Sequence, residues 1–160
     1  FGIITHASVN ENNVKILIKT EIEYLDLAEK RNQISKYLNK YNNNIKNVLL
    51  LKIGVPHLLI IMDTDISESI NDYGKYINEN IMDYDVNINF INLETENIRT
   101  YERGVNAETL ACGTGCCAGM VALNKNKVNF TVRSGETVTT SVEDGNLYLE
   151  GPVKKVYKVL

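Results

Sequence analysis

Residues 111–123, Ala-Cys-Gly-Thr-Gly-Cys-Cys-Ala-Gly-Met-Val-Ala-Leu, form the most apolar helical segment that the sequence indicates. From Cys116 onward every residue is small or apolar, so no face of this helix suits solvent. A helix without a polar face is a buried helix. Asn124 and the lysines at 125 and 127 predict where it ends, because asparagine tolerates the left-handed conformation and cations favour the negative end of a helix.

The sequence on both sides of this helix indicates a mixture of strands and surface helices. Strands are indicated at residues 14–18, 48–53, 58–62, 86–93 and 98–103. Amphipathic helices are indicated at residues 29–41 and 70–81, with Asp63, Asp65 and Ser67 as candidate caps of the second. From residue 128 onward strands alternate with turns, and Ser134-Gly135 and Asp144-Gly145 mark hairpins. We therefore expect one α+β domain, residues 1–160, with strands wrapped around a central buried helix.

The composition of the chain bears on which binding partners and which cellular compartment we expect. The chain of 160 residues has 17 Lys and Arg against 20 Asp and Glu, a net charge of −3, which gives no electrostatic reason to expect nucleic acid or an anionic membrane as partner. No apolar run is long enough to span a bilayer. The three cysteines lie within six residues of one another, which suits a reducing compartment better than a disulfide framework, so we expect a cytoplasmic protein. The sequence has no export signature, so nothing indicates secretion. It begins with Phe1 instead of methionine, so we expect a piece of a longer protein.

Cys112 is the residue most suited to chemistry. It stands at the predicted N-terminus of the buried helix, where unpaired N–H groups and the helix dipole favour both a thiolate and a bound carboxylate. Gly113 and Gly115 would let the backbone approach an anion closely. Cys116 and Cys117, inside the apolar helix, are expected to be buried hydrophobic residues. Metal binding is the rival interpretation, but Cys-x3-Cys-Cys lacks the paired spacing of a structural zinc site, so we expect no metal.

Three further residues have both a structural and a functional interpretation. His57 follows Pro56 between two apolar segments, where a histidine is usually a hydrogen-bonded structural residue. Glu102 and Arg103 could form an ordinary surface ion pair, which contributes little. At a strand end beside a glycine they could equally bind the amino and carboxylate groups of an amino acid, since arginine binds carboxylates in a bidentate manner.

Several motifs together resemble one enzyme family. They are Tyr-Glu-Arg-Gly at 101–104, Glu-Thr at 108–109, Ala-Cys-Gly-Thr-Gly at 111–115, Gly-x-Pro-His at 54–57, Val-Asn at 86–87 and Gly-Pro at 151–152. In their order along the chain they strongly resemble the C-terminal half of diaminopimelate epimerases. The match extends from about residue 54 to the end of the chain. It implies the epimerase fold, in which a mixed and antiparallel sheet forms a barrel-like shell around the central helix, and it makes residues 1–160 the second of two domains.

The resemblance implies cofactor-independent chemistry. Enzymes of this family interconvert LL- and meso-diaminopimelate, an intermediate of lysine biosynthesis, with two cysteines on opposite faces of the α-carbon. One cysteine removes the α-proton as a thiolate, and the other delivers a proton. The matching positions make Cys112 one of the pair, and they make His57 and Glu102 modulators of cysteine pKa.

The resemblance also assigns substrate contacts. Gly113 and Thr114 would hold the α-carboxylate at the helix N-terminus, where preorganised N–H donors stabilise the carbanion-like transition state. Asn87, Glu102 and Arg103 would contact the amino-acid substrate. The expected partners are therefore a small amino acid and the half of the enzyme that carries the second cysteine, and the family resemblance leaves a homodimer open.

Two departures from the family pattern bear on function. The second cysteine belongs to a Gly-Asn-Gly-type motif that this sequence lacks, so we expect residues 1–160 alone to be inactive. Val55 stands where the family has an asparagine that binds the distal end of diaminopimelate. Diaminopimelate, or an analogue such as lanthionine, remains the first expectation. A racemase of another amino acid, such as histidine, and a non-catalytic amino-acid-binding module are the alternatives.

Overall fold

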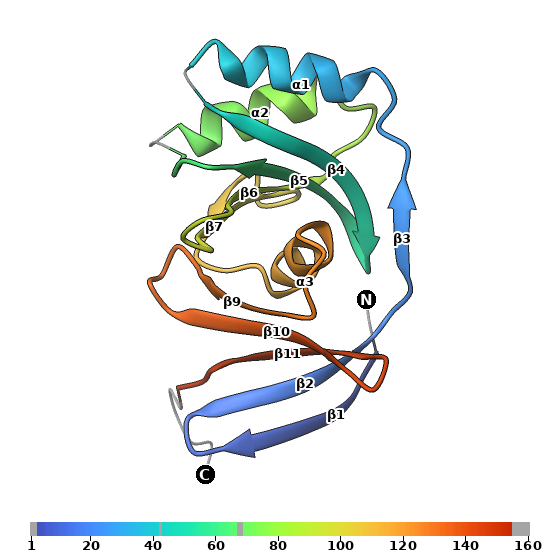
Figure 1. The fold of residues 1–160 in the computed structure, drawn as a ribbon, viewed down its shortest axis with the longest axis vertical. Coiled ribbons are helices and arrows are strands. Elements are labelled where there is room, and N and C mark those ends of the chain that lie inside the picture. Colours follow the sequence, from blue (N-terminus) through green and yellow to red (C-terminus); the bar gives the residue numbers. More distant parts are fainter. Residues whose placement is uncertain (1–2, 42, 67–68, 155–160) are drawn as a thin grey trace.

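The computed structural model describes residues 3–41, 43–66 and 69–154. Its strands form two sheets, and helix α3 (Gly113–Ala122) lies between them, in contact with strands of both (Figure 1). Helices α1 (Lys30–Asn39) and α2 (Ile70–Asn80) cover the other face of the larger sheet. Within the described ranges, no helix has the length and apolar character that crossing a membrane requires.

The larger sheet has six strands in the order β3-β4-β5-β6-β7-β8. These are β3 (Ile22–Leu25), β4 (Ile45–Ile53), β5 (Val55–Met62), β6 (Asn87–Asn92), β7 (Ile98–Glu102) and β8 (Ala107–Thr109). Strands β5 and β6 are parallel, with α2 in the connection between them, and the other neighbouring pairs are antiparallel. The parallel register places His57 beside Asn87 and Leu59 beside Asn89.

The smaller sheet is antiparallel throughout, in the order β1-β2-β11-β10-β9. Its strands are β1 (Ile3–Asn10), β2 (Asn13–Lys19), β9 (Lys127–Thr131), β10 (Thr137–Glu143) and β11 (Asn146–Pro152). Asp144 and Gly145 have φ angles of 49° and 76°, as the tight turn of a hairpin requires. Asn124, after α3, has a φ of 53°, which confirms the expected left-handed residue at this helix end.

Apolar residues pack on both faces of the larger sheet. Ile88 and Phe90 of β6 join the core beneath α1 and α2, whereas Ile91 joins the core around α3. The alternation of a strand therefore directs the amides of Asn87 and Asn89 towards α3. All six residues of β6 are buried, so these amides lie in the interior of the protein.

Closure of the expected barrel-like shell is not shown in the part of the chain that the structure describes. The strands make two separate sheets, which an isolated parallel bridge between Asn97 and Thr131 connects. Closure of the strands into a continuous barrel-like wall stays a prediction.

The expected caps of the second helix were wrong for two of the three residues. Helix α2 begins after Ser69, with no side-chain capping hydrogen bond. Asp63 instead forms an ion pair with Lys46 (2.7 Å), and Asp65 accepts a hydrogen bond from Asn92 Nδ2 (2.9 Å). Long-range partners therefore engage these two carboxylates. The third candidate cap, Ser67, lies outside the described residues.

Candidate functional site

A two-part cleft surrounds the N-terminus of α3. Two cavities of about 370 Å³ each adjoin one another and share Gly54, Glu102, Cys112 and Thr114. The first cavity is also lined by Ile16, Ile18, Thr20, Ala111, Gly113 and Leu149, and the second by Ile53, Val55, Asn87 and Arg103. One part of the cleft therefore has an apolar wall from the smaller sheet, and the other has a more polar wall from the larger sheet.

Cys112 stands between the two parts. It is the N-cap residue of α3, with extended backbone angles (φ −129°, ψ 105°), and its carbonyl accepts the hydrogen bond from the Cys116 N–H (3.0 Å). Its side chain is largely buried, with 8% of the residue exposed. Around Sγ lie Thr114 Oγ1 at 3.8 Å and Asn87 Nδ2 at 4.0 Å. The thiol is thus held against hydrogen-bonding groups from the helix and from β6.

The thiol of Cys112 does not have the lowered pKa that a helix N-terminus alone would give. Burial is the largest influence and, together with the charge of Glu102, raises the pKa of Cys112 to about 11. Hydrogen bonds from the Gly115 backbone and the Thr114 side chain act in the opposite direction but do not prevail. In this state of the protein the Cys112 side chain is a protonated thiol at neutral pH.

Glu102 is the last residue of β7 and points into the cleft. Its Oε1 accepts a hydrogen bond from Thr109 Oγ1 (2.7 Å) across the pair formed by β7 and the short strand β8. The turn between these strands contains Gly104, whose φ of 82° favours glycine. The strand pair therefore fixes a carboxylate beside the thiol.

Asn87 and Arg103 are linked through the backbone. The Arg103 N–H donates to Asn87 Oδ1 (3.0 Å), which leaves the amide nitrogen of Asn87 directed towards Cys112. The exposed Arg103 guanidinium donates to the Asp85 carbonyl (3.4 Å) at the edge of the second cavity. A cation and an amide donor thus lie on the same side of the cleft.

His57 is placed differently from the other expected site residues. It is completely buried and lines neither cavity, and its Nδ1 lies 3.2 Å from Asn89 Nδ2. Burial, with a smaller effect from the Arg103 charge, lowers the pKa of His57 to about 4; a backbone contact at Ile53 acts weakly in the opposite direction. The imidazole is therefore neutral at physiological pH, behind the cleft rather than in it.

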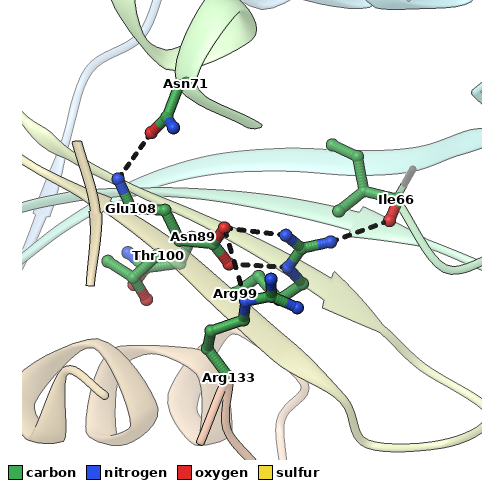
Figure 2. Close-up of polar contacts among 7 residues, drawn as sticks. All are labelled: Ile66, Asn71, Asn89, Arg99, Thr100, Glu108 and Arg133. Carbon is green, nitrogen blue, oxygen red and sulfur yellow. Dashed lines mark hydrogen bonds and ion pairs between the residues drawn. The ribbon is translucent and has the colours of Figure 1, made fainter. Parts of the chain in front are cut away.

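Two features of the surroundings were not identified from the sequence. One is Asn89, whose side-chain oxygen lies where a Cβ on Gly115 would have to be. The other is the ion pair between Arg99 and Glu108, with N–O distances of 2.6 and 2.7 Å, shown in Figure 2. The alternating amides of β6 were a signal for Asn89, but the partner of Glu108 is fixed only by the pairing of β7 with β8.

Gly113 and Thr114, the expected carboxylate-binding residues, form the first turn of α3 and line the cleft. A Cβ on Gly113 would lie 2.5 Å from Leu149 Cδ2, so a larger residue there would require the Leu149 side chain to move. Over the ranges that the structure describes, no group of three or more His, Cys, Asp and Glu side chains is arranged to hold a metal ion.

The fold has counterparts among solved structures. A predicted epimerase from Pseudomonas aeruginosa superposes with a TM-score of 0.57 at 11% identity, covering 95% of this chain and 62% of that one. A phenazine biosynthesis protein of the PhzF family from Enterococcus faecalis gives a TM-score of 0.61 at 14% identity, covering 94% and 58%. At these identities the likeness concerns the fold.

Sequence comparison is more specific. No protein-family model matches the chain. Diaminopimelate epimerases from Campylobacter jejuni and from a Nitratiruptor species are 32% and 36% identical, each over 89% of this chain. The corresponding enzyme from Halothermothrix orenii is 28% identical over 98% of it. The chain spans 59% of the length of the Campylobacter enzyme, 58% of the Nitratiruptor enzyme and 61% of the Halothermothrix enzyme. These matches identify the chain as a diaminopimelate epimerase-family sequence that corresponds to part of such an enzyme.

Proposed function

We propose that this chain supplies one half of the active site of a cofactor-independent amino-acid epimerase, with LL- and meso-diaminopimelate as the substrate pair. The observation that carries the proposal is the position of Cys112, at a helix N-terminus and in a cleft shared with Asn87, Glu102 and Arg103. A thiol, a carboxylate, a cation and an amide around one cavity match the groups of an α-amino acid.

The first turn of α3 is the proposed carboxylate site. The first N–H groups of a helix have no intrahelical acceptor, and Gly113 and Thr114 present theirs at the cleft. The helix dipole adds a favourable field for an anion. These donors would also stabilise the negative charge that spreads from the α-carbon onto the carboxylate when the α-proton leaves.

Cys112 is proposed as the acid of the pair in its resting form. With a pKa raised to about 11, its thiol holds the proton that the planar intermediate needs on one face. A thiolate on the opposite face would take the original α-proton, so the configuration inverts. In the reverse direction the two thiols exchange roles, and Cys112, once it has given up its proton, acts as the base.

The opposing thiol must come from residues other than those of α3. Cys116 and Cys117 are fully buried inside the same helix as Cys112, so neither can reach the opposite face of a substrate in the cleft. This supports the proposal that residues 1–160 are the C-terminal domain of a two-domain enzyme, whose strands would complete the barrel-like shell only in the whole protein.

The experiment that tests this function measures exchange of the α-proton of diaminopimelate in deuterated water. We expect the full-length gene product to catalyse exchange and its Cys112→Ala variant to lose it. The isolated 160 residues should show no exchange above that of buffer. Normal activity of Cys112→Ala would exclude the mechanism. A full-length protein without a second active-site cysteine and without exchange would favour a non-catalytic binding module.

Val55 supports a second candidate substrate. It lines the polar part of the cleft, where its aliphatic side chain offers no hydrogen bond to a distal amino-acid group. A racemase of another amino acid, such as histidine, is therefore the alternative. Racemisation of histidine in place of diaminopimelate by the full-length protein would select it, whereas a gain in diaminopimelate turnover in Val55→Asn would retain diaminopimelate as substrate.

A further inference from the structure

Asn89 connects His57 to the helix that carries Cys112. Its side chain is completely buried on β6, and its Nδ2 lies 3.3 Å from the Leu58 carbonyl and 3.2 Å from His57 Nδ1. Its Oδ1 accepts a hydrogen bond from Thr100 Oγ1 (2.9 Å), and Figure 2 shows these two side chains together on the larger sheet. Both the nitrogen and the oxygen of the Asn89 amide therefore have defined neighbours.

The chemistry of these neighbours fixes the orientation of the amide. A backbone carbonyl can only accept, so the amide group facing Leu58 must be the NH₂ group. The threonine hydroxyl can donate, which suits the oxygen on the other side. Since the NH₂ group can only donate, the His57 Nδ1 atom that it meets must be an unprotonated acceptor.

The same amide also determines how α3 approaches the sheet. A Cβ added to Gly115 would overlap Asn89 Oδ1 and would lie 3.2 Å from Cys112 Sγ. The backbone of the first turn can therefore lie against Asn89 only because residue 115 is a glycine. Histidine, amide and thiol-bearing turn form one contiguous buried arrangement.

We infer that Asn89 is a positioning residue that holds His57 in its neutral Nε2–H tautomer and seats the first turn of α3 beneath Cys112. The use of this arrangement in thiol chemistry rests on the proposed function, whereas the tautomer itself does not. The Nε2 atom is buried and has no hydrogen-bond partner among the described residues. An unsatisfied buried donor is costly, and in a native protein it calls for an explanation, of which a catalytic role is one.

The charged surroundings agree with a neutral ring. Burial and the Arg103 guanidinium both disfavour a second proton on His57. Asn89, Thr100 and the Leu58 carbonyl add no charge. The Ile53 backbone favours a proton on the ring but does not outweigh burial, and the Asn89 amide, which faces Nδ1, directs the single proton to Nε2.

Long-range proton–nitrogen NMR on the 160-residue chain tests the inference directly. The sequence has only two histidines, His6 and His57, so the imidazole region of the spectrum contains only two sets of signals. We expect His57 to show an unprotonated Nδ1 and a protonated Nε2 at neutral pH, and to remain so until the pH approaches 4. A protonated Nδ1, or rapid averaging of both tautomers, would overturn the inference.

Asn89→Asp extends the test. A carboxylate beside Nδ1 accepts instead of donating, so we expect Nδ1 to gain a proton and the midpoint of His57 titration to rise by about two pH units. Asn78→Asp is the matched control, because Asn78 is also a buried amide but bonds to Val86; its His57 signals should match those of the wild type. An unchanged ring in Asn89→Asp would refute the positioning role.

The outcome is separable from the epimerase proposal. If the full-length protein lacks α-proton exchange while His57 still holds the Nε2–H tautomer, the proposed function fails and this inference stands. If exchange is present but His57 Nδ1 carries the proton, the proposed function stands and this inference fails. The wild-type spectrum alone decides the tautomer, so the test does not depend on the folding of a variant.

Discussion

At the scale of single residues, opposing influences act on Cys112. Its position at the N-terminus of α3 favours the thiolate, and the Gly115 backbone and Thr114 side chain add hydrogen bonds to it. Burial and the Glu102 carboxylate favour the thiol, and they prevail. The ionisation of Cys112 therefore depends on what enters the cleft and on whether the charge of Glu102 is offset.

The first prediction concerns alkylation of Cys112. Because the reactive species is the thiolate, modification of the isolated chain by iodoacetamide should be slow at pH 7 and should rise with a midpoint near pH 11. Mass spectrometry of the digested protein locates the label, and the fully buried Cys116 and Cys117 should remain unlabelled while the protein is folded. A midpoint near or below pH 8.5, the ordinary thiol value, would show that the helix terminus prevails.

The second prediction concerns Glu102. Glu102→Gln removes the neighbouring negative charge, so the alkylation midpoint of Cys112 should fall by about one pH unit. Glu108→Gln serves as a control, because that carboxylate pairs with Arg99 instead of facing the thiol. Equal shifts in both variants would mean that general loosening, not the charge of Glu102, governs the thiol.

The site residues could be singled out from the sequence, but their environment could not. The residues that the motifs singled out, Cys112, Asn87, Glu102, Arg103, Gly113 and Thr114, line one cleft, and their roles stay a prediction. The pKa of Cys112 was not accessible, since it depends on burial between two sheets. Nor could the sequence show that His57 lies behind the cleft wall, because the partner Asn89 is 32 residues away and reaches it only through parallel pairing of β5 with β6.

At the scale of elements, close packing of helices on the larger sheet depends on glycine. A Cβ on Gly74 of α2 would overlap the ring of Tyr101 on β7. Gly74→Ala should therefore destabilise the protein by about 1–3 kcal/mol, although alanine is the better helix former. Urea unfolding measures the change, and the exposed neighbour Lys75→Ala should be almost neutral. A Gly74→Ala protein of unchanged or increased stability would contradict this packing.

A second element-scale prediction concerns strand β8, which has only three residues. It is held by the Arg99–Glu108 ion pair and by the bond from the Glu108 N–H to Asn71 Oδ1 (2.6 Å; Figure 2). Glu108→Gln should cost about 2 kcal/mol of unfolding free energy, because the largely buried Arg99 loses its counter-charge. Arg133→Ala is the control: Arg133 meets the same carboxylate at 3.8 Å but is mostly exposed, so its loss should cost less than about 0.5 kcal/mol. Similar costs for both variants would contradict the prediction, because the exposed ion pair with Arg133 would then contribute as much as the buried one with Arg99.

Long strands and helices were predicted more successfully than short ones. The continuous apolar run of β5 was evident, whereas β3 and β8 have four and three residues and too few positions to show a period. Strand β5 also begins earlier than expected, at Val55, because Gly54 makes a tight turn with a φ of 72° and Pro56 is accommodated inside the strand. Strand β1 lies at the edge of its sheet and its side chains from His6 to Asn10 are exposed, so its sequence lacks a buried face.

At the scale of the whole molecule, the larger sheet carries apolar cores on both faces and His57 in its interior. The pKa of His57 is lowered to about 4 in the folded state, against an ordinary value of 6.5. The unfolded chain therefore binds more protons between these values, and stability must fall as the pH falls from 6.5 to 4. Below pH 4 the full loss from this group has been reached.

The corresponding prediction is a loss of about 3 kcal/mol of unfolding free energy between pH 7 and pH 4 that is attributable to His57. His57→Gln keeps an acceptor for Asn89 but cannot gain charge, so its stability should decline less over the same interval. Parallel curves for wild type and His57→Gln, measured by urea unfolding at each pH, would show that His57 retains its ordinary pKa.

The Gly54–Val55 turn brings a residue of the cleft wall to the edge of the fold, away from the interior packing. It lies at the tip of the β4–β5 hairpin, where the φ of 72° at Gly54 favours glycine and Val55 lines the cleft. Cys112, Asn87 and their supports belong to strands and a helix that also hold the interior together. Replacement of Val55 can therefore be tolerated where replacement of the buried groups around Cys112 cannot, so that, under the proposed function, a lineage can change its substrate while the groups that transfer the proton stay the same.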